Sequence, residues 1–201
     1  MSEGIERALS SIDSYLKERD EVREQALKLT RDIVRASKTV ISLVFKGELK
    51  EAERRAGELE ATARELVRRL SGYPDILYSG LVYNGLSEYV EAMLFLDVAW
   101  GRVMRTHEEL GVPPVPYLQG LGDLVGELRR LALERLREGE LEEAWRLVRV
   151  MEVVYFSLSR LEYPESLIPG VRHKADVARR LLDETIALLV HVEALGPRTR
   201  Q

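Results

Sequence analysis

Two pairs of carboxylates are the residues of this sequence whose type and spacing could support chemistry. Glu88 and Glu91 stand three positions apart, and Asp123 and Glu127 stand four apart, so each pair would share one face of a helix. Glu88 and Glu91 also interrupt a face that is otherwise mostly apolar. Because burying an ionised carboxylate without a partner is very unfavourable, we expect a basic side chain, a shared proton or a metal ion beside them.

The two pairs together would favour a hard divalent cation. If the segments that carry them pack antiparallel, Glu88, Glu91, Asp123 and Glu127 converge. Four carboxylates suit Mg²⁺ or Mn²⁺. Two such ions can activate a water molecule and stabilise the leaving oxygen during phosphodiester cleavage.

Three glycines surround the second pair, at Gly120, Gly122 and Gly126. Glycine inside a helix lowers its stability by about 1 kcal/mol relative to alanine. Such a cluster in one helix therefore needs a compensating reason. We expect a close approach by another backbone or by a ligand.

The spacing of the four carboxylates is also compatible with a purely structural role. Asp123 and Glu127 lie away from the apolar stripe of their helix and could face water, while Glu88 and Glu91 could pair with Arg102 or another arginine. The chain would then be a helical scaffold without a metal. A ferritin-like di-iron centre is a poorer alternative, because it needs Glu-x-x-His pairs on two helices. None of the three histidines has a glutamate three positions earlier.

Basic residues gather at two further places. Arg31, Arg35 and Lys38 share one face of the predicted first helix, where they could hold phosphates or form a solvated surface. Arg172 and Lys174 open the last predicted helix. Positive charge at a helix N-terminus opposes the helix dipole, which favours a bound partner such as phosphate.

The elements that must position these residues are all predicted to be helices. Apolar residues recur at intervals of three and four between sparse Gly and Pro breaks, and no segment alternates long enough to form a strand. The breaks predict helices over about 5–46, 49–70, 75–110, 116–138, 141–158 and 171–192. We therefore predict an all-α fold, an antiparallel bundle of about six to seven helices, with residues 1–201 forming a single domain.

Composition excludes several classes of protein. Hydrophobic residues make up 45% and charged residues 32% of the chain, which excludes disorder. The sequence has no cysteine and therefore no disulfide or zinc–thiolate site. A net charge of −4 is not typical of a duplex-DNA binder. No apolar segment suggests a membrane span or a signal peptide, so we expect no membrane partner and a cytoplasmic location.

Four segments, taken together, are specific enough to suggest a family. They are Ser87–Ala92 with Phe95 and Arg102 after it, Tyr117–Gly120 with Asp123–Arg129 after it, Arg31–Lys38 and, more loosely, Arg172–Lys174. These segments resemble the translin/Trax family, and the similarity covers roughly residues 15–195. The first two segments are specific in combination, although either would be weak alone.

The resemblance places the sequence on the Trax side of the family, among the archaeal-type Trax-like ribonuclease subunits. The catalytic carboxylates of Trax lie on two helices and match Glu88, Glu91, Asp123 and Glu127 here, whereas translin lacks the full set. The resemblance thus implies a translin-like fold and an endoribonuclease that depends on Mg²⁺ or Mn²⁺. It further implies a hollow shell, an octamer, that encloses single-stranded RNA.

The resemblance leaves one alternative and includes one departure. The alternative is a catalytically inactive ring that binds single-stranded RNA or single-stranded DNA. The departure is Trp100, which stands where Trax has a lysine, so one basic contact to RNA is expected to be absent. The candidate RNA-binding residues are Arg31, Arg35, Lys38, Arg102, Arg172 and Lys174.

Overall fold

The chain folds into helices throughout residues 2–196, the part that the computed structural model describes. No strand occurs in these residues, so the predicted all-α fold is confirmed. Six helices are long and two are single turns: α1 (Ser2–Phe45), α2 (Leu49–Leu70), α3 (Pro74–Leu77), α4 (Gly80–Ala99), α5 (His107–Leu110), α6 (Pro114–Glu138), α7 (Leu141–Ser159) and α8 (Val171–Ala194).

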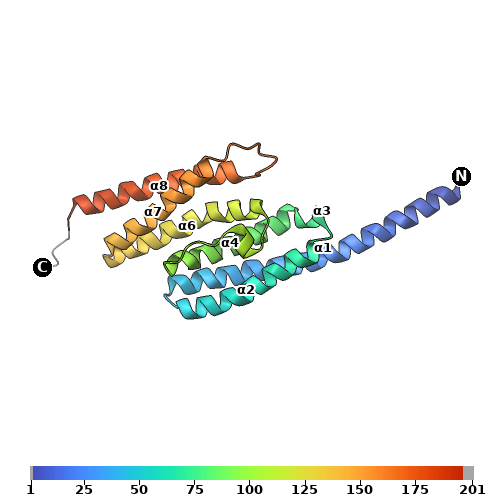
Figure 1. Cartoon of the computed structure of the whole chain (residues 1–201), viewed down its shortest axis with the longest axis horizontal. Coiled ribbons are helices and arrows are strands. Elements are labelled where there is room, and N and C mark those ends of the chain that lie inside the picture. The colour runs from blue at the N-terminus through green and yellow to red at the C-terminus, as the bar shows by residue number, and fades with distance from the viewer. Residues whose placement is uncertain (1, 197–201) are drawn as a thin grey trace.

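Helix α4 lies at the centre of the bundle. It packs against α1 and α2 on one side and against α6 on the other, while α7 and α8 cover α6 (Figure 1). Its apolar residues point in every direction, which is typical of a helix buried all round. Tyr89, Leu86 and Phe95 are completely buried, and each such side chain contributes about 1.5–3 kcal/mol through removal from water. This packing fixes the two glutamates of α4 at the junction with α1 and α6.

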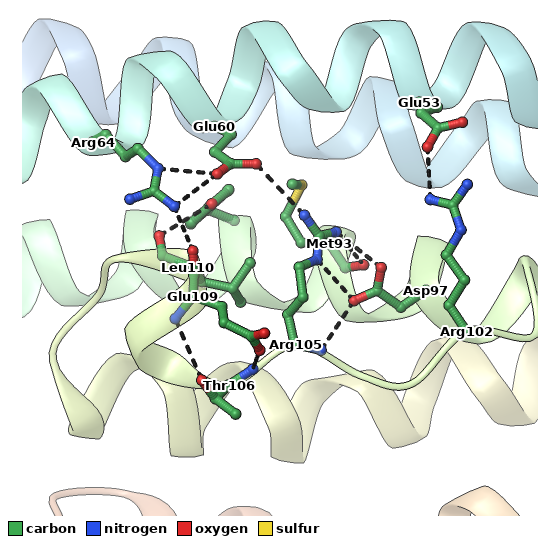
Figure 2. Close-up of polar contacts among 11 residues, drawn as sticks. Glu53, Glu60, Arg64, Met93, Asp97, Arg102, Arg105, Thr106, Glu109 and Leu110 are labelled. Carbon is green, nitrogen blue, oxygen red and sulfur yellow. Dashed lines mark hydrogen bonds and ion pairs between the residues drawn. The ribbon is translucent and has the colours of Figure 1, made fainter.

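The predicted helix over 75–110 is wrong, because the structure divides this segment into α3, α4 and α5. Helix α4 ends at Ala99, and Gly101 adopts a left-handed conformation with φ +67°. The buried Asp97 then accepts hydrogen bonds from the backbone N–H and the guanidinium of Arg105, at 3.2 and 3.0 Å (Figure 2). This contact reverses the chain. The prediction relied on the spacing of apolar residues, and that spacing contains no signal of a contact between Asp97 and Arg105.

After the reversal, the chain returns along α2 instead of making a tight turn. Arg102 pairs with Glu53 at 2.6 Å, and further along α2 Arg64 donates to the carbonyl of Glu109 (Figure 2). Thr106 begins α5 with a capping box that it shares with Glu109. Such a box satisfies two N–H groups that a helix start otherwise leaves free. The return brings the chain back to the level at which α4 began.

As a result, α4 and α6 run in the same direction, not antiparallel as expected (Figure 1). Near the starts of the two helices, Ser87 donates a hydrogen bond to the carbonyl of Pro116. Near their ends, the ring of Phe45 lies 5.2 Å from that of Phe95 and 4.1 Å from the guanidinium of Arg130. Short connections do make α1 and α2, and α6 and α7, antiparallel neighbours. Only the return segment breaks this pattern.

The first half of α1 extends beyond the rest of the bundle (Figure 1). Its apolar residues are more than half exposed, including Ile5, Leu9, Ile12 and Leu16. They recur at intervals of four, three and four, so they form one stripe along the helix. Within residues 2–196, no helix has both the length and the apolar character that crossing a membrane requires.

Candidate functional site

A cavity of about 880 Å³ opens between α1, α4 and α6, with α8 at its edge. All four carboxylates singled out from the sequence line it, and we call Glu88, Glu91, Asp123 and Glu127 the carboxylate cluster. Basic side chains line it as well, namely Lys38, Lys46, Arg130 and Lys174. The structure therefore brings the two predicted pairs together even though α4 and α6 are parallel.

The two glutamates of α4 have no basic partner among residues 2–196. Neither Glu88 nor Glu91 forms an ion pair with any residue in the described part of the chain. Burial, the largest cause, and the charges of Asp123, Glu127 and Glu88 together raise the pKa of Glu91 from its ordinary value of 4.5 to about 8. In the absence of a metal, Glu91 is therefore protonated at neutral pH.

The α6 pair lines the cavity, where the side chain of Asp123 is 38% exposed. Asp123 forms an ion pair with Lys174 of α8, whose Nζ lies 2.6 Å from Oδ2. Burial raises the pKa of Glu127. The Oε2 atom of Glu127 is buried and has no hydrogen-bond partner among the described residues, with Nη1 of Arg130 the nearest cation at 3.7 Å. Both carboxylates of α6 thus have a basic neighbour, a close lysine for Asp123 and a more distant arginine for Glu127, whereas the basic partner expected from the sequence for Glu88 and Glu91 is absent among the described residues.

Two of the three glycines allow the close approaches expected from the sequence. A Cβ atom on Gly120 would lie 2.5 Å from the carbonyl oxygen of Ser87, so this glycine brings α6 against α4. A Cβ atom on Gly122 would lie 2.7 Å from Cβ of Lys174, so this glycine admits α8. Gly126 faces open space. The glycines therefore place the cluster and Lys174 within reach of one another.

Two basic residues of the cavity were missed by the sequence analysis. Arg130 packs over the ring of Phe45 and lies three residues after Glu127. It is thus on the cluster's face of α6, a spacing that could have identified it. Lys46 lies just beyond the end of α1. No periodicity predicts that this turn reaches the cavity.

Of the six predicted RNA-binding residues, Lys38 and Lys174 line the cavity and four do not. Arg35 pairs with Asp32 at 3.1 Å on the surface of α1. Arg102 is held by Glu53 on α2 (Figure 2) and does not orient a carboxylate of the cluster. The other two, Arg31 and Arg172, are exposed.

The donor atoms of the cluster fit Mg²⁺ or Mn²⁺ in type but are not yet arranged around an ion. Carboxylates are the ligands that both ions prefer. The Oε2 atom of Glu127, which accepts no hydrogen bond from the described residues, is available to coordinate an ion. However, no three acidic or histidine side chains within residues 2–196 are grouped so that they could hold a metal. In addition, the ammonium of Lys174 contacts both carboxylate oxygens of Asp123.

Comparisons with known sequences agree on one family. The model of the Translin family matches residues 21–184. An uncharacterized protein of Methanocaldococcus jannaschii is 30% identical over 179 residues, which cover 88% of this chain and 79% of that protein. Translin-associated protein X of Rattus norvegicus is 24% identical over 192 residues, which cover 76% of this chain and 66% of the rat protein.

Solved structures share the fold over nearly the whole chain. The crystal structure of AfC3PO has 33% identity and a TM-score of 0.85, covering 94% of this chain and 98% of that one. A complex of AfC3PO with duplex RNA has 31% identity and a TM-score of 0.86, with the same coverage. Apo-NeC3PO has 25% identity and a TM-score of 0.81, covering 90% of this chain and 95% of that one.

Proposed function

This chain belongs to the translin family, and we propose that it is a metal-dependent endoribonuclease of the Trax type. The observation that carries the proposal is the carboxylate cluster, because side chains from two helices line one cavity between basic residues. Two of them, Glu91 and Glu127, have raised pKa values that reflect burial and crowded negative charge. Perturbed carboxylates in a cavity are typical of catalytic sites.

The basic residues of the cavity would hold the substrate. Lys38, Lys46 and Arg130 are placed to contact the phosphates of a strand that enters the cavity. The carboxylate cluster would repel the same phosphates, so productive binding needs a cation between them. When bound, Mg²⁺ or Mn²⁺ would supply an activated water and stabilise the leaving oxygen. The cluster would hold and orient that cation.

The proposed substrate is RNA, and the proposed assembly is a closed shell of several copies, an octamer, in the cytoplasm. Support for RNA comes from AfC3PO, which was solved with duplex RNA. We propose a preference for single-stranded RNA, because an enclosed cavity admits a flexible strand more readily than a wide, stiff duplex. Single-stranded DNA is proposed as a further ligand, without cleavage.

The test is cleavage of a labelled single strand and its duplex, with Mg²⁺, with Mn²⁺ and with EDTA. We expect cleavage with either ion, and none with EDTA although helical content is retained, because the core does not need the ion. Glu88→Ala should lower turnover by at least about 100-fold, since positioning and charge stabilisation both fail. Asp183→Ala, at an exposed carboxylate of α8, is the matched control. Full-rate cleavage in EDTA would refute the proposal.

A second candidate function is an inactive ring that binds single-stranded nucleic acid. It is favoured by the ion pair between Lys174 and Asp123 and by the lack of a ready group of three ligands in the described residues. The two candidates differ in one outcome. If the parent and Glu88→Ala bind RNA equally and neither cuts it with either ion, the chain is a binding protein.

A further inference from the structure

Lys174 places a positive charge inside the acidic cavity. Its Nζ lies 2.5 and 2.6 Å from the two carboxylate oxygens of Asp123, so it sits in the fork between them. A divalent cation bound by both oxygens would occupy the same fork. The backbone holds the lysine there, because the missing side chain of Gly122 lets the stem of Lys174 pass against α6.

The ammonium acts on more than Asp123. Its charge lowers the pKa of Glu91, opposing the three carboxylates that raise it. Lys174 is 27% exposed, so water screens it only partly. It therefore supplies, within the chain itself, part of the positive charge that a metal would bring.

Space for the side chain to move lies on its other side. Lys174 also lines a second cavity of about 460 Å³, together with Tyr83, Asn84 and Gln119. Asn84 belongs to both cavities, so the two adjoin at the position of the lysine. A flexible four-carbon stem can carry the ammonium from Asp123 into this space.

We propose that Lys174 is a built-in competitor of the divalent cation, which holds Asp123 in the metal-free protein and must release it when a metal binds. The inference rests on the proposed function, because it assumes that the carboxylate cluster is a metal site. Its consequence is weaker metal binding than four carboxylates would give alone. Because of this competition, the divalent cation binds well only when a further interaction stabilises the displaced ammonium of Lys174. The phosphates of a bound nucleic acid would provide that interaction.

The experiment measures the affinity for Mn²⁺ alone, by calorimetry and by the electron paramagnetic resonance signal of free Mn²⁺. Lys174→Met keeps the apolar stem and removes the charge, so it should bind Mn²⁺ at least about tenfold more tightly than the parent. Lys174→Arg keeps the charge and should stay near the parent. Lys28→Met, at an exposed lysine of α1 outside the cavity, should change the affinity less than threefold.

Thermal unfolding gives a second measurement. Without metal, Lys174→Met should melt below the parent, because the cluster loses its cation. Saturating Mn²⁺ should raise its melting temperature by more than it raises that of the parent. If Lys174→Met does not fold, Lys174→Gln takes its place in both measurements.

The outcomes separate the inference from the proposed function. Equal or weaker Mn²⁺ binding by Lys174→Met overturns the competition and leaves the metal site intact. Binding by Lys174→Met but not by the parent supports both. If neither the parent nor any variant binds Mn²⁺, the proposal of a metal site is refuted, and the inference about Lys174 is refuted with it.

Discussion

Glu91 is the carboxyl whose pKa responds to the other three carboxylates of the cavity. Asp123, Glu127 and Glu88 act on it together, and the ammonium of Lys174 opposes them only in part. The carboxyl stays neutral by taking up a proton, which is the response expected when burial and like charges coincide. Of the possibilities that the sequence left open for Glu88 and Glu91, the raised pKa of Glu91 favours the uptake of a proton, and neither glutamate has a basic partner in the described residues.

The first prediction concerns stability against pH. The pKa of Glu91 is raised to about 8 in the folded chain, so the folded state holds this proton more tightly than the unfolded state. The stability from this group is fully present below its ordinary value of 4.5 and is lost as pH rises to about 8. Glu91→Gln cannot ionise. In EDTA it should therefore melt at least a few degrees above the parent at pH 8.5, with a smaller difference at pH 5.

Melting curves of both proteins between pH 5 and 8.5 check this. Glu134→Gln changes another carboxylate of the same cavity and serves as the control. A difference between Glu91→Gln and the parent that stays constant over this range would show that Glu91 is ionised throughout.

At this scale, residue types and spacing were enough to find the carboxylate cluster but not its cation. Glu88 and Glu91 on one helix, and Asp123 and Glu127 on another, are visible as pairs in the sequence. Lys174 lies 51 positions from Asp123, and their contact depends on how α8 docks. The place of Lys174 at a helix N-terminus and the resemblance to a family both suggested that it was relevant, but as a contact to phosphate or RNA.

Among the elements, the pair α4 and α6 determines the geometry of the site. They approach each other closely at Gly120, where even one methyl group would meet the Ser87 carbonyl and the side chain of Val90. Backbone atoms cannot yield as a flexible side chain can. The separation of the helices, and with it the separation of the carboxylates, therefore depends on this glycine.

The second prediction compares two alanine substitutions in α6. Gly120→Ala should lower the free energy of unfolding by at least about 1–3 kcal/mol, because overpacking forces α6 away from α4. It should also weaken Mn²⁺ binding, since the carboxylate cluster spreads. Gly126→Ala is the matched control, because its Cβ meets open space. It should stabilise the helix by about 0.4–1 kcal/mol.

Chemical denaturation with urea measures both changes. Since each variant adds the same methyl group to the same helix, intrinsic helix propensity is common to the two and cancels in the comparison. Equal stability of the two variants would contradict the close approach at Gly120.

Helix ranges could be predicted where amphipathic periodicity and a Gly or Pro break coincide, as at Gly47 and Gly139, which both have positive φ. The prediction failed between Ala99 and Thr106 for a different reason. There the chain reverses because a buried Asp97 binds Arg105, and such a contact leaves no periodic signal. The same error produced the wrong direction for α6, because a helix that ends earlier leaves enough chain to return.

On the scale of the whole molecule, the projecting half of α1 leaves apolar side chains exposed to solvent. Its apolar stripe of Ile5, Leu9, Ile12 and Leu16 is 52–63% exposed, and its inner end, at Leu16, borders a cavity beside α3 and α4. The spacing is that of a helix which packs against another helix. The first helix is too long for its own bundle to cover, a mismatch in length that is visible in Figure 1.

The last prediction is that the chain assembles in solution and that this stripe contributes to the assembly. Light scattering coupled to size exclusion should give a mass several times the 23.0 kDa of one chain. Combining Leu9→Glu, Ile12→Glu and Leu16→Glu should reduce that mass without lowering helical content or the cooperativity of unfolding, because these side chains are exposed within one chain. Ser11→Glu with Ser14→Glu adds charge to the opposite face and should leave the mass unchanged. A parent mass of one chain would refute the assembly. An unchanged mass in the triple variant would place the contacts elsewhere, and the enclosed cavity would then have to be built from the faces of the bundle.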